Sequence, residues 1–166
     1  MKDGHSAVFL VGFMGVGKTT SGRALARLLG WEFVDLDERI VDLEGKSIAD
    51  IFAERGEAHF RALEAGVLSG LRGRTRVVVA CGGGTYAEER CRALIDAIGR
   101  AVWLRSSLAQ ALARCAQGPV RPMLRDAAQA ESVYLTRVPS YRMAPLRVDV
   151  EGLAPEEVAV RIAALL

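Results

Sequence analysis

Cysteine and histidine are scarce in this chain, whose 166 residues include only three cysteines and two histidines. The cysteines, Cys81, Cys91 and Cys115, form no C-x-x-C pair, and their odd number is typical of reduced thiols rather than of a disulfide framework. With His5 and His59 as the only histidines, ligands for a structural zinc site are also few. We therefore expect a fold that depends on neither disulfides nor zinc.

Long apolar runs and an excess of one charge are missing as well. The longest apolar runs, such as Ala7 to Val11 and Val77 to Cys81, are far too short to cross a bilayer, and the amino terminus lacks the apolar stretch of a signal peptide. The formal net charge is only +2, with acidic and basic residues mixed along the chain. We expect a cytoplasmic protein that binds neither nucleic acid nor a membrane surface.

What the sequence does contain is a regular alternation of short apolar runs and segments with helical periodicity. The runs predict strands at 7–12, 31–35, 76–81, 101–105 and 146–150. Helices are predicted at 18–29, at 47–71 with a break near Gly56, at 87–98, at 107–117 and from Pro155 onward. Continuous apolar runs are typical of parallel strands covered on both faces. We predict a single α/β domain, residues 1–166, with a five-stranded parallel sheet in a three-layer α/β/α sandwich.

Residues 12–19 match the pattern G-x-x-x-x-G-K-[ST] of a phosphate-binding P-loop, between a predicted strand and a predicted helix. Gly12, Gly15 and Gly17 let the backbone turn its N–H groups toward a phosphate, and the helix adds the positive end of its dipole. Lys18 would reach the β- and γ-phosphates, and Thr19 would offer its hydroxyl to Mg²⁺. The guanine-reading N-K-x-D motif of GTP switches is absent. The pattern predicts a site for ATP and Mg²⁺.

Two aspartates, Asp35 and Asp37, end the second predicted strand. With this spacing on extended backbone, both side chains point the same way, at the strand end where ligands bind in open α/β sheets. We assign Asp35 to the metal, through its water shell, and Asp37 to the proton of an attacking substrate hydroxyl. The alternative is that Asp37 merely caps a helix that starts near Glu38.

Several further motifs follow one another along nearly the whole chain. In order, the motifs are Gly12 to Thr19, Asp35-Leu-Asp37, Ile48-x-x-Ile-Phe52, Gly56-Glu-x-x-Phe-Arg61-x-x-Glu64, Gly82-Gly-Gly84, Arg121-Pro-Met-Leu124 and Tyr141-Arg142. Together they resemble the motifs of the shikimate kinases. The resemblance implies a P-loop kinase that uses ATP and Mg²⁺ to phosphorylate the 3-hydroxyl of shikimate, giving shikimate 3-phosphate and ADP. This reaction is a step of chorismate and aromatic amino-acid biosynthesis.

The resemblance also implies which residues would bind the substrate. Arg61 and Arg142 would clamp the carboxylate of shikimate from opposite sides, and Asp37 would take the reacting hydroxyl. Gly83 and Gly84 would offer backbone groups, because residues without side chains let a ligand approach closely. A guanidinium fork suits bidentate capture of a carboxylate. The alternative for both arginines is a solvated position on a helix.

On the nucleotide side, the resemblance implies that the loop and the start of its helix bind the phosphates of ATP through Gly15, Val16, Gly17, Lys18, Thr19 and Thr20. Residues 117–128, the least regular segment of the carboxy-terminal half, predict a mobile lid. Arg121 in this lid would close over ATP and, together with Lys18, stabilise the charge of the transferring phosphoryl group. Arg114 and Pro155 would flank the adenine.

The chain departs from the family pattern in three places: Met123 stands where leucine is usual, Cys81 precedes the triple glycine, and Thr85-Tyr86 follow it where smaller apolar residues are common. Tyr86 would alter the shape beside the substrate. A Walker B aspartate is missing from residues 77–84, so the metal relies on Thr19, with Asp35 acting through water. Two alternatives stay open: another small-metabolite kinase, of the gluconate or adenylylsulfate type, and an ATP-binding module that transfers nothing. We expect a monomer whose partner is its small-molecule substrate.

Overall fold

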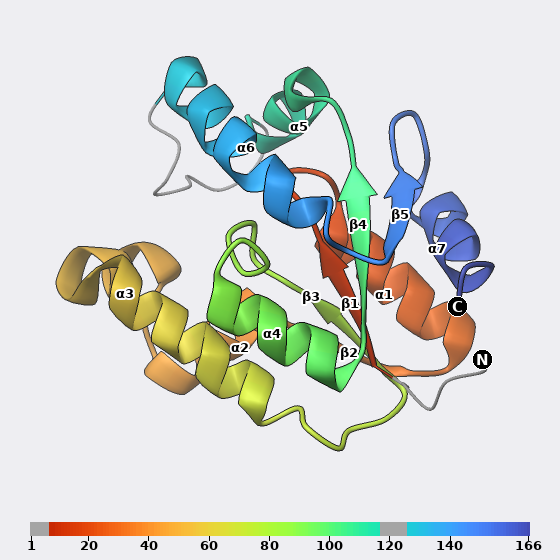
Figure 1. The fold of residues 1–166 in the computed structure, drawn as a ribbon, viewed down its shortest axis with the longest axis horizontal. Helices are drawn as coiled ribbons and strands as arrows, with labels where there is room; N and C mark the ends of the chain where they lie inside the picture. Colours follow the sequence, from red (N-terminus) through yellow and green to blue (C-terminus); the bar gives the residue numbers. More distant parts are fainter. Residues whose placement is uncertain (1–6, 117–125) are drawn as a thin grey trace.

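A sheet of five parallel strands forms the centre of the protein (Figure 1). In the computed structural model, which describes residues 7–116 and 126–166, the strands are β1 (Ala7–Val11), β2 (Glu32–Asp35), β3 (Val77–Ala80), β4 (Arg100–Arg105) and β5 (Leu146–Asp149). The strand order is β2-β3-β1-β4-β5, and all neighbours are parallel. Every residue of β1 and β3 is buried, as expected for continuous apolar strands inside a sandwich. The predicted sheet is confirmed.

Helices cover both faces of this sheet. In the described part of the chain they are α1 (Lys18–Leu29), α2 (Leu36–Glu44), α3 (Ile48–Ser69), α4 (Glu89–Ile98), α5 (Leu108–Cys115), α6 (Ala127–Tyr141) and α7 (Pro155–Ala163). In Figure 1, α4 lies in front of the sheet and α1 behind it. Helix α7 packs on α1, and α3 packs on both α2 and α4. The three layers of the predicted α/β/α sandwich are confirmed.

The helix signals in the sequence mark real helix boundaries. Helix α1 has the predicted bounds, and α3 leaves helical geometry at Gly56, where φ is 80° and ψ is 174°. Helix α7 starts at Pro155, and the Glu157 carboxylate accepts a hydrogen bond from the Ala154 backbone N–H at 2.8 Å. Among the described residues, no helix is both long enough and apolar enough to cross a membrane.

Two helices, α2 and α6, are missing from the predicted helices, and α6 corrects the predicted lid. The N-cap of α6 is Asp126, whose Oδ1 accepts a hydrogen bond from the Gln129 N–H at 2.7 Å. Residues 126–128 therefore begin a helix instead of ending a lid. Polar residues and Pro139 within α6 weaken its helical signal. The rest of the predicted lid, 117–125, lies outside the described residues.

The strand register decides which loops meet at the carboxyl edge of the sheet. Ala80 of β3 is level with Leu10 of β1 on one side and with Asp35 of β2 on the other. The P-loop after β1, the aspartates after β2 and the glycines after β3 therefore leave the sheet side by side. Helices α5 and α6 pack on each other above the same edge (Figure 1). This edge is the place where a ligand is expected in such a fold.

Candidate active site

A cavity of about 720 Å³ opens at this carboxyl edge. That volume is within the range of sites for small molecules and cofactors. Its lining combines the P-loop, Asp35 and Asp37 with the glycines after β3, Arg61 of α3, and Arg114 and Pro155 from the carboxy-terminal half. The structure thus gathers into one site residues that lie far apart in the sequence.

The P-loop forms one wall of the cavity, and its shape depends on Gly15. This residue has a φ of 77°, which only glycine adopts without strain. It also lies so close to α5 that an added Cβ would stand 2.3 Å from the Ala111 carbonyl oxygen and 2.8 Å from Cys115 Sγ. Lys18 Nζ donates hydrogen bonds to the carbonyl oxygens of Gly12 and Phe13, both at 2.8 Å. The ammonium group is therefore held across the loop, where phosphates would lie.

Asp35 connects α1, the helix that follows the P-loop, to α2 through hydrogen bonds. Thr19 Oγ1 donates a 2.6 Å hydrogen bond to Asp35 Oδ2, and Asp35 Oδ1 accepts from the backbone N–H groups of Asp37 and Glu38 at 3.0 and 3.2 Å. Asp35 is therefore the N-cap of α2, a role typically worth about 1 kcal/mol of stability. The alternative that Asp37 caps this helix is wrong, because the cap lies two residues earlier.

The Thr19 hydroxyl and the Asp35 carboxylate are the oxygen donors that Mg²⁺ prefers, and both line the cavity. No group of three or more histidine, cysteine, aspartate or glutamate side chains suited to a metal occurs in the part of the chain that the structure describes. Mg²⁺ at phosphate-transfer sites is held by one or two protein ligands plus substrate phosphates. The donor set of Thr19 and Asp35 fits that type of binding.

Asp37 lies in the first turn of α2 and lines the cavity. Its Oδ1 lies 3.1 Å from the position that a Cβ on Gly82 would occupy, so the carboxylate is directly beside the loop that follows β3. This proximity results from the pairing of β2 with β3, which brings their carboxyl ends together. The sequence places Asp37 at this edge, and the structure places it beside the glycines.

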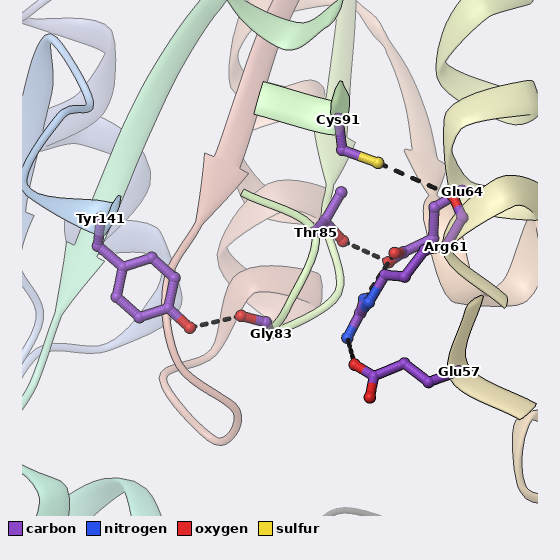
Figure 2. A network of polar contacts seen from close by, with 7 residues as sticks. All are labelled: Glu57, Arg61, Glu64, Gly83, Thr85, Cys91 and Tyr141. Carbon is purple, nitrogen blue, oxygen red and sulfur yellow. Dashed lines mark hydrogen bonds and ion pairs between the residues drawn. The ribbon is translucent and has the colours of Figure 1, made fainter. Parts of the chain in front are cut away.

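Arg61 is held against the glycine loop by acidic partners on its own helix (Figure 2). Its Nη1 is 2.6 Å from Glu64 Oε2, and its Nη2 is 3.2 Å from Glu57 Oε1. A Cβ on Gly84 would stand 2.2 Å from Nη2, so only glycine lets the guanidinium lie there. Burial acts to lower the pKa of Arg61, but the charges and hydrogen bonds of Glu64 and Glu57 raise it above its ordinary value. The group is a permanent cation in the cavity wall.

The second arginine of the cavity is Arg137, and the prediction of Arg142 is corrected. Arg142 is exposed at the carboxyl end of α6 and does not line the cavity. Arg137 lines it, is 7% exposed, and lies with Nη1 3.2 Å from the position of a Cβ on Gly83. Tyr141, one turn further along α6, donates a hydrogen bond to the Gly83 carbonyl oxygen (Figure 2).

The helical repeat explains this exchange of arginines. Residues four apart share a helix face, so Arg137 and Tyr141 both face the glycine loop, whereas the residue after Tyr141 points elsewhere. Burial lowers the pKa of Arg137, and Tyr141 partly opposes this effect. If the sequence pattern had revealed α6, the four-residue spacing from Tyr141 would have identified Arg137 as a residue that faces the cavity.

Most of the residues predicted to bind the nucleotide line the cavity. They are Gly15, Val16, Gly17, Lys18, Thr19, Thr20, Arg114 and Pro155. Arg114 Nη1 donates a hydrogen bond of 3.5 Å to the Val16 carbonyl oxygen, which joins α5 to the P-loop. Arg121, with the rest of 117–125, lies outside the described residues.

Tyr86 does not shape the cavity, contrary to expectation. Its side chain is fully buried and is not part of the lining, and its hydroxyl donates a 2.9 Å hydrogen bond to Asp96 Oδ1 on α4. Thr85 is equally buried, and its hydroxyl donates to Glu64 Oε1 at 2.5 Å. Cys81 does line the cavity, although it is almost fully buried.

We expect the thiols of Cys81 and Cys91 to react slowly with alkylating reagents. Burial raises the pKa of Cys81 well above its ordinary value, and the charge of Glu64 adds to this effect. The same causes raise the pKa of Cys91 to about 12. Because the thiolate is the nucleophile and a raised pKa depletes it, iodoacetamide at pH 8 should modify both at least about a hundredfold more slowly than in urea.

The measurement is peptide mass spectrometry of timed samples from native and unfolded protein. Cys115, which is only partly buried, provides the internal reference. Labelling of Cys81 in native protein at the rate seen in urea would contradict the prediction.

Comparison with known proteins adds the family. A family model described as "Shikimate kinase" matches residues 14–166. The chain is 42% identical to the shikimate kinase of Geobacter sulfurreducens, over 97% of this chain and 90% of the relative, and 36% identical to that of Persephonella marina, over 93% and 95%. The structure of Acinetobacter baumannii shikimate kinase in complex with shikimate aligns with a TM-score of 0.91 and 34% identity, covering 98% of this chain and 93% of the other. The chain belongs to the shikimate kinase family.

Proposed function

We propose that this protein transfers the γ-phosphoryl group of ATP to the 3-hydroxyl of shikimate, giving shikimate 3-phosphate and ADP. The observation that carries the proposal is the pairing of a P-loop with two arginines, the partly buried Arg61 and the buried Arg137, in the same cavity. The P-loop suits a nucleotide triphosphate, and the arginines suit a small organic anion. Membership of the shikimate kinase family supports this choice of acceptor.

On the acceptor side, Arg61 and Arg137 bind the carboxylate of shikimate. Their guanidinium groups lie beside Gly84 and Gly83, on either side of the turn after β3. The backbone of these glycines is open to close contact with the ring substituents of the substrate. Two fixed cations separated by a turn orient the acid as well as bind it. Positioning of the reactants is a main contribution of an enzyme to phosphoryl transfer.

Asp37 accepts or orients the proton of the attacking hydroxyl. It lines the same cavity as the P-loop and the glycine turn, with its carboxylate beside Gly82. The carboxylate is therefore near both reactants, as a general base must be. Asp35 has a different task, because capping of α2 and the hydrogen bond from Thr19 occupy its oxygens.

On the nucleotide side, Lys18 and the loop amides bind the phosphates, and Arg114 and Pro155 flank the base. Thr19 would hold Mg²⁺ directly and Asp35 through water, and the ion would neutralise charge on the phosphate oxygens. Arg121 is assigned to the transferring phosphoryl group on sequence grounds alone. The reaction then depends on positioning and on charge stabilisation by Lys18 and the arginines.

A panel of acceptors tests the proposal. ADP formation is measured with shikimate, quinate, gluconate and adenylylsulfate, each with MgATP and purified protein. We expect efficient turnover with shikimate and a kcat/KM at least about a hundredfold lower for the others, because only shikimate fits both the clamp and the base. Turnover with gluconate but not shikimate would overturn the acceptor, and ATP binding without any transfer would favour a non-catalytic module.

A further inference from the structure

The buried hydroxyl of Thr85 is connected to the carboxylate clamp through one side chain. Thr85 and Glu64 each have no exposed surface. Thr85 Oγ1 donates to Glu64 Oε1 at 2.5 Å, and Glu64 Oε2 accepts from Arg61 Nη1 at 2.6 Å (Figure 2). The two oxygens of one carboxylate thus bridge the glycine turn and the arginine.

The hydroxyl is held by the same turn that lines the cavity. The backbone N–H of Thr85 donates to the Gly82 carbonyl oxygen at 3.2 Å, which closes the turn after β3. The position of a Cβ on Gly82 would lie 3.0 Å from Thr85 Oγ1 and 3.1 Å from both Glu64 Oε1 and Asp37 Oδ1. Thr85 therefore provides a hydrogen-bond donor where two carboxylates approach the turn.

The hydrogen bond fixes the plane of the Glu64 carboxylate. A carboxylate with one bonded oxygen can rotate about its last torsion, which is broad for glutamate, whereas bonds to both oxygens define one orientation. Glu64 in turn holds Nη1 of Arg61, so this orientation sets the direction of the guanidinium fork. Without the hydroxyl, Glu64 Oε1 would be buried without this donor, and the guanidinium would be held less firmly.

We propose that Thr85 is a positioning residue for the acceptor: its hydroxyl, acting through Glu64, orients Arg61 for the substrate carboxylate. The inference rests on the proposed role of Arg61 as a carboxylate clamp.

The test begins with Thr85→Val, which keeps the shape of the side chain and removes the hydroxyl. We expect the KM for shikimate to rise about tenfold, while kcat and the KM for ATP change less than about twofold. Thr85→Ser, which restores a hydroxyl, should return the KM to within about twofold of the parent. Thermal unfolding of each variant is measured alongside, and Thr85→Ala replaces the valine variant if that one does not fold.

Two further readouts separate positioning from a general loss of structure. In an Arg61→Ala background, Thr85→Val should change the KM for shikimate less than about twofold, because the residue acts through Arg61. The preference for shikimate over its carboxamide analogue should also fall in Thr85→Val, since only the carboxylate engages the guanidinium fork. Together these results would support the proposal.

The outcomes also separate this inference from the proposed function. If Arg61→Ala raises the KM strongly but Thr85→Val and Thr85→Ala leave it unchanged, the positioning role is overturned while the clamp stands. The role is overturned as well if Thr85→Val has the same effect with and without Arg61. If Arg61→Ala leaves the KM unchanged, the clamp itself fails.

Discussion

Replacement of Asp37 by asparagine is expected to lower kcat by about two orders of magnitude or more, the usual contribution of a positioned general base. Asparagine has nearly the same shape but cannot accept the proton of the attacking hydroxyl. The KM for ATP should change little, because the loop that binds the phosphates is built from other residues. The measurement is steady-state turnover of shikimate at saturating MgATP.

The structure provides a control for this variant on the same helix. Asp42 also lies on α2 but is exposed to solvent, so Asp42→Asn removes an equal charge away from the cavity. Both variants should unfold at nearly the parent temperature, since Asp35 caps the helix. Normal turnover by Asp37→Asn would refute the role of this residue, whereas equal losses in both variants would indicate a general effect of charge.

Truncation of Arg137 to alanine is expected to raise the KM for shikimate about thirtyfold or more, corresponding to about 2 kcal/mol of lost binding. Arg137 is buried in the cavity wall beside Gly83, where a carboxylate would receive its hydrogen bonds. The matched control is Arg142→Ala on the same helix, which removes an exposed arginine and should change the KM less than about twofold.

This pair of variants decides between the two arginines directly. A large effect at Arg142 with none at Arg137 would mean that α6 presents a different face to the acceptor than it does here. Calorimetric titrations with shikimate and with ATP distinguish lost binding from lost structure, because a folded Arg137→Ala protein should lose affinity for shikimate but still bind ATP. Arg137 interacts with Tyr141, which donates to the Gly83 carbonyl oxygen, so Tyr141→Phe provides a milder perturbation of the same contact.

Local patterns in the sequence were sufficient for most of the fold. The predicted ranges match all five strands of the described sheet: continuous apolar runs marked β1, β3 and β4, whereas β2 and β5 also contain charged residues. Glycine, proline and acidic residues marked where α1, α3 and α7 begin, break or end. These signals are readable because they depend on neighbours in the chain: propensity, capping and periodicity act over a few residues. Helix α6 was missed since its polar residues and internal proline give a weak periodic signal.

The motifs were equally sufficient for the nucleotide side of the site. A P-loop is defined by residues close together in the chain, so its glycines, Lys18 and Thr19 could be placed without a tertiary structure. Asp35 and Asp37 could also be placed at the edge of the sheet, and the first was assigned to the metal and the second to the substrate. The structure adds the hydrogen bonds that make Asp35 the N-cap of α2 and the partner of Thr19.

By itself, the sequence determined the class of the protein, the positions of its five strands and the residues of its P-loop. Only the tertiary structure decided that Arg137 and not Arg142 faces the cavity, and that Thr85, Glu64 and Arg61 form one connected group. The physical reason is distance along the chain. Contacts between α3, the turn after β3 and α6 join residues tens of positions apart, and their geometry depends on how the helices pack against the sheet.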